Sequence, residues 1–490
     1  MPLYSYLCLT KHIKMIIGRI EEQGAMNHLL ELQSADLLMI TGRRRVGKTF
    51  LINDVYKDNF VFKFTGTQHT NRANQLKKFS EKLSEFSKES IDELQPKNWY
   101  EAFSLLKKYI SGLRKTKKKK VIFFDEFPWI DHKKSGFLEE FGYWWNDWAS
   151  TQNLLVVISG SATSWMVRKI IQHRGGLHNR VTQRIHLEPF TLSETKTFIK
   201  TINKGISDYD ILQIYMCMGG VPLYLNQLRA GESAAQAIHR ICFSKTGLLR
   251  TEFEDVYASL FDNYQNHVEV IKALAQKWCG LTRTEISQIS KLADGGSLNR
   301  ILEDLEESSF IMKIHPLFNQ KKEVIYRLAD EYSRFYLHFI DGNKYGTIEN
   351  WLKFQTTSNI YQTWQGYAFE TICIKHAEAI KKCLGISGIQ TSVNSFYKKG
   401  SDKARGFQID MLISRADNAI NLCEIKFYDG IVRFNEKIAI NLREKRSLFK
   451  ELSGTKYSVF NTMITTFGID KTSYSSSEID NEITMSCLFE

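Results

Sequence analysis

The chain has 490 residues and a formal net charge of +12, with 43% hydrophobic and 24% charged residues. This length is too great for one hydrophobic core and predicts about three domains. No stretch approaches the roughly 18 consecutive apolar residues of a membrane-spanning helix, so no membrane partner is expected. The start lacks the basic segment of a secretory signal. The eight cysteines form no CxxC pair, which excludes a zinc signature and predicts buried thiols in a cytoplasmic protein.

The positive charge is most concentrated in residues 114–120, RKTKKKK. Two interpretations stay open for this run. It is either a solvated turn before a strand, or a contact to nucleic-acid phosphates that carries no sequence specificity.

A phosphate-binding motif follows the first predicted buried strand, residues 37–41. Its pattern, Gly42 and then Gly47-Lys48-Thr49 after four residues, is G-x-x-x-x-G-K-[ST] before a helical pattern. The glycines let backbone N–H groups face phosphate oxygens, and the helix N-terminus adds positive potential. We expect Lys48 to reach the β- and γ-phosphates of ATP and Thr49 to hold Mg²⁺. The predicted nucleotide contacts here are Gly42, Arg43, Arg44, Arg45, Val46, Gly47, Lys48, Thr49 and Phe50.

A second predicted strand, residues 121–124, ends in Asp125-Glu126. Ligands of parallel sheets collect at the carboxyl ends of the strands, where these acids fall. Asp125 is predicted to bind the Mg²⁺ shell, and Glu126 to orient or deprotonate the attacking water. The alternative is an acidic turn after a core strand. After a third apolar run, 154–158, Ser161 either senses the γ-phosphate or belongs to an ordinary turn.

Six segments in chain order resemble the P-loop ATPases of the AAA+/STAND superclass that are often called archaeal-type ATPases. They are IIGRIEE, GRRRVGKT, FFDEFPWI, SGSATSWM, GGLHNRVTQRIHLEPF and GGVPLYL. The resemblance implies that Ile17, Gly18 and Arg19 lie beside the adenine. It implies that Arg180 either contacts the γ-phosphate or acts as an arginine finger on a neighbouring subunit. The family usually has Gly-Arg here, whereas this chain has Asn179-Arg180. Pro222 would belong to a helical lid near the nucleotide. Residues 1–14 have no counterpart, so the start is either Met1 or Met15.

Residues 190–260 are predicted to be helical, with a helix start at Ser193, and residues 261–340 to form three helices and a two-stranded hairpin. This is the order of a winged helix-turn-helix, whose third helix would read DNA. That helix carries more acids than bases, which favours a packing or protein-contact module over a sequence-specific regulator. The acids are Glu303, Asp304, Glu306 and Glu307.

After a predicted linker, 341–350, the tail is expected to form a separate α/β unit. If a three- or five-residue loop is centred on Asp417, the residue numbers of any two facing residues add up to 834. Asp410 then lies opposite Glu424, and Lys426 lies on the same face of the hairpin. Met411, Ile413, Cys423, Ile425 and Phe427 would then form the apolar face. A two-residue turn would separate the two acids.

Two converging carboxylates repel unless a cation is present, which predicts Mg²⁺ or Mn²⁺. Asp410 followed by Glu424-Ile425-Lys426, with Glu370 on the preceding helix, resembles the PD-(D/E)xK nuclease superfamily. In this interpretation Asp410, Glu424 and Glu370 hold the metal, and Lys426 stabilises charge on the phosphorane. The alternative is a surface salt bridge between Glu424 and Lys426.

The predicted fold class is α/β: a P-loop NTPase parallel sheet with a helical lid, a winged helix-turn-helix and a C-terminal restriction-endonuclease-like domain. The predicted domains are 1–189, 190–260, 261–340 and 350–490. We expect an Mg²⁺-dependent ATPase whose nucleotide state controls a tail that binds or cleaves nucleic acid, with DNA favoured over RNA. The alternative is a STAND-like switch that forms a homo-oligomer on ATP binding and has an inactive tail.

Overall fold

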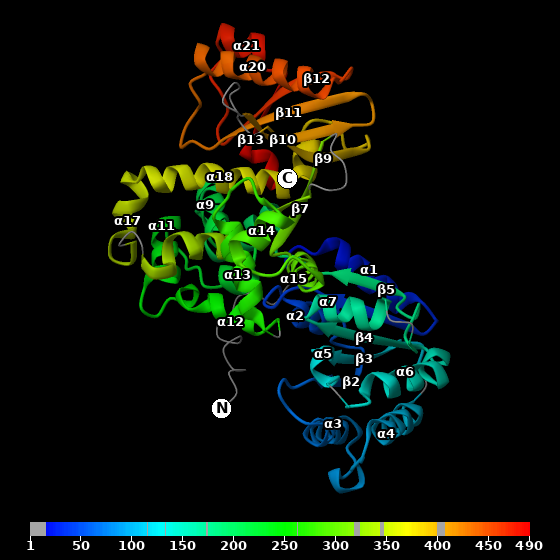
Figure 1. Ribbon diagram of the computed structural model, residues 1–490. Helices are drawn as coiled ribbons and strands as arrows, with labels where there is room; N and C mark the ends of the chain where they lie inside the picture. The colour runs from blue at the N-terminus through cyan, green and yellow to red at the C-terminus, as the bar shows by residue number, and fades with distance from the viewer. Residues whose placement is uncertain are drawn as a thin grey trace. The chain divides into compact units, whose positions relative to one another are not determined.

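The computed structural model describes residues 16–114, 116–132, 134–172, 175–261, 263–317, 324–343, 347–398 and 407–490. The chain divides into two compact units, Met1–Glu188 and Pro189–Glu490, which are described separately (Figure 1). Among these described residues, we find no helix with both the length and the apolar character that crossing a bilayer requires.

The first unit is built on a five-stranded parallel sheet with the order β2-β3-β4-β1-β5. Three central strands are nearly all buried, as their continuous apolar runs predict for a sheet covered on both faces. The strands are β1 (Asp36–Thr41), β2 (Phe60–Thr65), β3 (Lys120–Asp125), β4 (Leu154–Gly160) and β5 (Gln183–His186).

Helices cover the sheet of the first unit on both faces (Figure 1). One face packs against aromatic-rich α3, α4 and α6, and the other packs against α1 and α2. The helices are α1 (Ile20–Glu31), α2 (Lys48–Val55), α3 (Arg72–Ser87), α4 (Trp99–Gly112), α5 (Phe127–Ile130), α6 (Phe137–Asp147) and α7 (Thr163–Met166).

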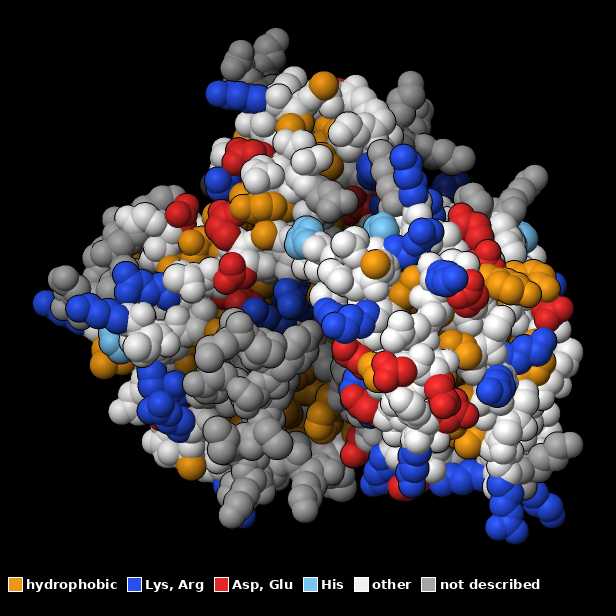
Figure 2. All heavy atoms as spheres, turned by 90° about the horizontal axis from the view of Figure 1, so that it is seen from below, with side chains coloured by type: hydrophobic (Ala, Val, Ile, Leu, Met, Phe, Trp, Pro, Cys, Tyr) orange, Lys and Arg blue, Asp and Glu red, His pale blue; other side chains and the backbone are white. Residues whose placement is uncertain are grey.

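The lysine run before β3 is not wholly solvated. Lys119 is buried, and its Nζ lies 2.5 Å from Asp36 Oδ2 and donates to the carbonyl of Leu29 at 2.8 Å. This pair sits at the amino ends of β1 and β3, away from the strand ends that carry the phosphate motif. Figure 2 shows basic and acidic side chains interspersed on the face in view, so the excess charge is not gathered in one patch there.

The second unit begins with helices, as the pattern of residues 190–260 predicts. They are α8 (Leu192–Ile202), α9 (Asp208–Met218), α10 (Pro222–Leu225), α11 (Ala234–Ile238) and α12 (Glu252–Ala258). The predicted start at Ser193 is wrong. Thr191 is the N-cap, because its hydroxyl accepts from the N–H of Glu194 while the Glu194 carboxylate accepts from the N–H of Thr191.

Three helices and a short antiparallel sheet follow, in the predicted order. They are α13 (Tyr264–Ala275), β6 (Leu281–Thr282), α14 (Arg283–Ser290), α15 (Gly296–Glu307), β7 (Ile311–Pro316) and β8 (Ile325–Leu328). Thr282 caps α14 with Glu285. The predicted turn at 319–322 lies outside the described residues.

The remaining elements are α16 (Glu331–Phe335), α17 (Thr347–Thr357), α18 (Asn359–Lys375), α19 (Ala377–Cys383), β9 (Thr391–Lys398), β10 (Phe407–Arg415), β11 (Ala419–Lys426), α20 (Glu436–Ser453), β12 (Ser458–Thr465), α21 (Ser473–Glu478) and β13 (Asn481–Thr484). The predicted hairpin register is confirmed: every pair from Met411↔Cys423 to Arg415↔Ala419 has the index sum 834.

The tail is not the independent unit that the sequence predicts. Its strands continue into the preceding hairpin as one sheet, ordered β13-β12-β11-β10-β9-β7-β8-β6, because β7 pairs in parallel with β9. Helix α17 begins inside the predicted linker, and Trp351 is buried with its ring centroid 4.7 Å from that of Phe243. Helices, hairpin and tail therefore pack together within the second unit.

The expectation of free thiols is wrong for one pair of cysteines. Cys383, at the end of α19, and Cys487 form a disulfide with 6.1 Å between their Cα atoms. Four other cysteines are buried and unbonded, as expected: Cys217, Cys242, Cys373 and Cys423. Nothing in the sequence spacing links Cys383 to Cys487, which lie 104 residues apart.

Candidate functional site

The loop between β1 and α2 has a backbone that only glycine fits at its first position. Gly42 has φ +135°, and a Cβ there would lie 2.2 Å from the carbonyl oxygen of Leu187. Gly47 and Arg45 also have positive φ, at 93° and 75°. The loop therefore curls tightly before Lys48, which opens α2, as the phosphate-binding motif predicts.

Lys48 is buried, and its ammonium is held by the loop itself. Its Nζ donates to the carbonyls of Gly42 at 2.7 Å and Arg43 at 3.0 Å, and to Ser161 Oγ at 2.9 Å. Burial lowers the pKa of Lys48 to about 8, against the opposing pull of Glu126 and Asp125. A phosphate oxygen would compete well for this ammonium, because its direct hydrogen-bond partners are neutral carbonyls and a hydroxyl.

Asp125 joins the loop to the neighbouring strands. Its Oδ2 accepts from Thr49 Oγ1 at 3.0 Å, and its Oδ1 accepts from Ser159 Oγ at 2.5 Å. Gly42 N–H donates to Thr163 Oγ1 at 3.2 Å. Sequence reasoning included Ser159 in the run Ser159-Gly160-Ser161, where a hydroxyl could sense the γ-phosphate, but it did not single out Thr163. Ser159 lies near the end of β4, the strand between β1 and β3.

Glu126 comes directly after Asp125 and has a left-handed backbone, with φ 47°. Its Oε1 accepts from Ser161 Oγ at 3.1 Å, and its Oε2 accepts from Ser161 N–H at 3.3 Å. Burial raises the pKa of Glu126, against the lowering effect of Lys48. A carboxylate of raised basicity next to a phosphate loop can orient or deprotonate water.

The segment before α1 is also ordered in the first unit. Ile17 is buried, and Gly18 and Arg19 both have positive φ. The Arg19 guanidinium donates to the carbonyl of Glu188 and lies 3.4 Å from Glu22 Oε1. Within the P-loop, Val46 is buried and the Arg44 guanidinium lies 6.0 Å from the Trp129 ring centroid, while Phe50 is half exposed.

Arg180 is not among the residues whose contacts build this cluster. Arg180 lies exposed in a turn before β5, and the described side-chain contacts of the P-loop and its acids come from other residues. Pro222 is the first residue of α10 in the second unit. Their predicted roles beside the nucleotide stay predictions.

A second cluster lies at the carboxyl end of β11. Asp410 Oδ2 accepts from the N–H of Ile425 at 2.9 Å. Burial, followed by the nearby Glu424 and Glu370 carboxylates, raises the pKa of Asp410 to about 7. Glu424 is bound by two ammonium groups: Oε1 lies 2.7 Å from Lys426 Nζ, and Oε2 lies 2.6 Å from Lys445 Nζ. Burial opposes this pairing, but the two lysines lower the pKa of Glu424.

Glu370 is close enough to Asp410 to raise its pKa, yet it is engaged elsewhere. Its Oε1 lies 3.0 Å from Nη2 of Arg327, on β8, and both side chains are almost fully buried. Within the described parts of the chain, no group of three or more His, Cys, Asp or Glu side chains is arranged to hold a metal ion. The role of Glu370 as a third metal ligand stays a prediction.

The acidic face of the hairpin is less polar than expected. Leu412 and Leu422, on the same face as Glu424, are buried in an apolar cluster with Phe449 of α20. On the opposite face, Phe427 packs against Phe369 of α18, with 5.5 Å between ring centroids. The charged groups therefore occupy one end of a strand that is buried on both faces.

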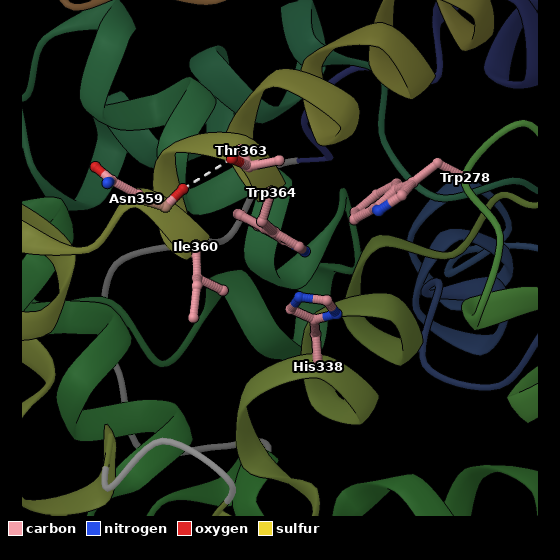
Figure 3. Close-up of a pocket in the computed structure, with 6 residues that line it drawn as sticks. All are labelled: Trp278, His338, Asn359, Ile360, Thr363 and Trp364. Atoms are coloured by element: carbon pink, nitrogen blue, oxygen red, sulfur yellow. Dashed lines mark hydrogen bonds between the residues drawn. The ribbon is translucent and has the colours of Figure 1, made fainter.

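The second unit also holds an aromatic cavity of about 290 Å³ that the sequence did not predict. Figure 3 shows the rings of Trp278, His338 and Trp364 pointing toward one another, with Asn359, Ile360 and Thr363 from the first turns of α18. Trp364 Nε1 is buried there without a hydrogen-bond acceptor among the described residues.

Residues 17–228 match the family described as "ATPase domain predominantly from Archaea". An uncharacterised protein of Methanocaldococcus jannaschii is 23% identical over 439 residues, which cover 89% of this chain and 92% of the relative.

Two solved structures resemble the chain. A Walker-type ATPase of Pyrococcus abyssi has a TM-score of 0.50 and 19% identity, over 66% of this chain and 96% of its own. The ORC2 protein of Aeropyrum pernix has a TM-score of 0.41 and 14% identity, over 70% of this chain and 97% of its own. The similarity to the Pyrococcus abyssi structure indicates a shared fold.

Proposed function

We propose that residues 17–228, which match an archaeal-type ATPase domain, bind and hydrolyse ATP in a magnesium-dependent reaction at the P-loop. The observation that carries the proposal is the contact of Thr49 Oγ1 with Asp125 Oδ2 at 3.0 Å. A hydroxyl and a carboxylate at this distance are oxygen ligands that suit Mg²⁺. When bound there, Mg²⁺ would neutralise charge developing on the phosphates.

Each residue of the cluster has a role in this proposal. Lys48 exchanges its loop carbonyls for the β- and γ-phosphates, and the loop N–H groups hold the phosphate oxygens. Glu126 orients the attacking water and takes its proton. Ser161 senses the γ-phosphate, because its hydroxyl contacts both Lys48 and Glu126.

Two substitutions test these roles separately. In Lys48→Ala both ATP binding and turnover should be lost, because the phosphates lose their cation. In Glu126→Gln, binding should persist by calorimetry while steady-state turnover falls on the order of 100-fold or more. ATP turnover that survives Lys48→Ala would overturn the assignment of the site.

We further propose that the C-terminal half of the second unit is a nuclease-like module that binds or cleaves nucleic acid. Support comes from the order of elements: helix α18, three antiparallel strands β9 to β11, helix α20, and the parallel strand β12. Glu424 and Lys426 lie at the end of β11, and Asp410 of β10 is close to them, since its Oδ2 accepts from the N–H of Ile425. Mg²⁺ or Mn²⁺ held by Asp410 and Glu424 would polarise a phosphodiester and acidify a bound water.

The raised pKa of Asp410 is the observation that fits a cation there. Burial is the largest cause of the raised pKa, followed by the Glu424 and Glu370 carboxylates, and a divalent ion would offset the repulsion among the three groups. Nicking of a supercoiled plasmid in Mg²⁺ or Mn²⁺, lost in Asp410→Ala, is the expected result. A wild-type protein that binds nucleic acid without any cleavage would favour the alternative, an inactive tail on an ATP-driven switch, which the double pairing of Glu424 with lysines also fits.

Contacts within the second unit support control of this module by the nucleotide state. Tyr209, on α9 of the predicted lid, stacks on Phe427 with 5.6 Å between ring centroids. The N–H of Leu192, which opens α8, donates to Nε2 of His376 at the end of α18. A displacement of α8 and α9 would therefore also displace Phe427, which follows Lys426, and helix α18, which carries Glu370.

This control has its own test. Nucleic-acid binding or cleavage should change between the ADP and non-hydrolysable ATP states. In Tyr209→Ala that difference should shrink, while ATP turnover is retained. A wild-type protein whose tail responds identically to both nucleotides would overturn the coupling.

A further inference from the structure

We infer that the carboxyl end of β11 takes a single-stranded segment of nucleic acid, with a phosphate held between Lys426 and Lys445 and an adjoining base lying on Tyr428. The inference rests on the proposed nucleic-acid function of the tail. It goes beyond that function by naming the state of the strand and two residues, Lys445 and Tyr428, that the sequence motif does not include.

The phosphate site is built from two elements. Lys426 ends β11, and Lys445 lies in the middle of α20, yet both ammonium groups contact the Glu424 carboxylate, at 2.7 and 2.6 Å. Glu424 compensates one of the two charges, and the Asp410 carboxyl also lies near both lysines. The lysine side chains remain 38% and 19% exposed, so they reach solvent. Two partly exposed ammonium groups from different elements suit the negative charge of a phosphodiester.

The stacking surface follows directly along the chain. Tyr428 is 50% exposed, whereas its neighbour Phe427 packs inward against Tyr209 and Phe369. The backbone of Tyr428 is fixed on both sides by Thr466, whose Oγ1 accepts from the N–H at 3.0 Å and donates to the carbonyl at 2.5 Å.

Two more partly exposed apolar side chains lie close in the chain to Tyr428 and to its partner Thr466. Ile431 is 64% exposed, and it precedes Val432, which pairs with Ile469 beside the end of β12. Phe467, also partly exposed, lies two residues before Ile469. An exposed aromatic ring on a fixed backbone, two residues after a lysine of the phosphate site, is a combination found in proteins that bind single strands.

The strand preference follows from what each contact can reach. Lysines attract the phosphates of a duplex and of a single strand alike, because the contact is electrostatic. An aromatic ring can stack only on a base whose face is free, and in a duplex interior both faces are covered by neighbouring bases. Tyr428 should therefore separate the two forms, and Lys445 should not.

The test is fluorescence anisotropy with the full-length protein, a labelled oligothymidylate and a labelled duplex of the same length, in EDTA so that no cleavage intervenes. Wild type should bind the single strand more tightly than the duplex. Tyr428→Ala should weaken single-strand binding about 10-fold and leave duplex binding unchanged, and Tyr428→Phe should restore it. Lys445→Gln should weaken both forms and reduce the salt dependence.

The matched control is Tyr457→Ala. Tyr457 is 42% exposed and precedes β12, at the opposite end of the sheet from Lys426, so its removal should change neither affinity. Equal affinity of wild type for both forms, or no effect of Tyr428→Ala, overturns this inference alone. Folded wild-type protein that binds neither nucleic acid overturns the proposed function of the tail as well.

Discussion

Arg327 and Glu370 form an ion pair with 3.0 Å between Nη2 and Oε1, in which both side chains are almost completely buried. The pair joins β8 of the hairpin to helix α18 of the tail. Asp410 lies near enough for Glu370 to raise its pKa. The hairpin and the candidate metal site are thus electrostatically linked.

Removing one partner of this pair should be costly, because the other charge is then left buried without compensation. We expect Arg327→Met to lower the free energy of unfolding by about 3–5 kcal/mol. The double variant Arg327→Met/Glu370→Gln should recover most of this loss. Urea unfolding of the three proteins measures it, and equal losses in the single and double variants would contradict the explanation.

His376 should make the stability of the second unit depend on pH. Its Nδ1–H donates to the Ile372 carbonyl at 2.9 Å and its Nε2 accepts from Leu192 N–H at 3.0 Å, which requires the neutral ring. Burial lowers the pKa of His376 to about 4. The unfolded state then binds the proton first as pH falls, so stability is full above about pH 6.5 and declines toward pH 4.

The expected loss between pH 7.5 and pH 5 is about 2 kcal/mol. His376→Gln, which keeps a neutral acceptor, should remove this part of the pH dependence. Urea unfolding at the two pH values gives the difference. If the free energy of unfolding of His376→Gln depends on pH as strongly as that of wild type, other groups cause the pH dependence.

Gly42→Ala should abolish nucleotide binding, because the added Cβ would overlap the carbonyl of Leu187 and the backbone has a positive φ. Gly24→Ala is the matched control. Gly24 lies inside α1 with no atom within 4 Å of an added Cβ, so stability should rise by about 0.5–1 kcal/mol with ATP affinity unchanged. Calorimetry with ATP and thermal unfolding report the two effects.

Loss of the bond between Cys383 and Cys487 should lower the free energy of unfolding of the second unit by about 2–4 kcal/mol. Cys487→Ser and the double variant with Cys383→Ser should behave alike, since either change breaks the same link. Mass spectrometry without reductant should find the bonded peptide. If dithiothreitol destabilises the double variant as much as wild type, the reductant does not act through the disulfide between Cys383 and Cys487.

The sequence predicted those parts of the candidate sites that depend on spacing along the chain. The loop before Lys48, the acids at the end of β3 and the hairpin register from Met411 to Arg415 follow from local periodicity. The register shift of β10 between Ile409 and Leu412, beside Asp410, does not. Lys445 was missed although it contacts Glu424, because nothing in the pattern of α20 distinguishes it from other helical lysines.

Contacts between distant segments could not be predicted in this way. Arg327 and Glu370 are 43 residues apart, and Cys383 and Cys487 are 104 apart. The pairing of β7 with β9 depends on how two separately plausible domains meet. Residue patterns specify which faces are apolar, but several partners can cover an apolar face, and only the assembled core selects one.

The junction of β7 with β9 bears on how the molecule can be divided for study. Cutting the chain near residue 345 would leave backbone hydrogen-bonding groups of β7 and β9 unpaired, so that each becomes an exposed edge strand. Exposed edge strands pair with strands of other molecules. A fragment that starts at α17 would therefore tend to self-associate, whereas one that starts before α13 keeps its neighbouring strands in place.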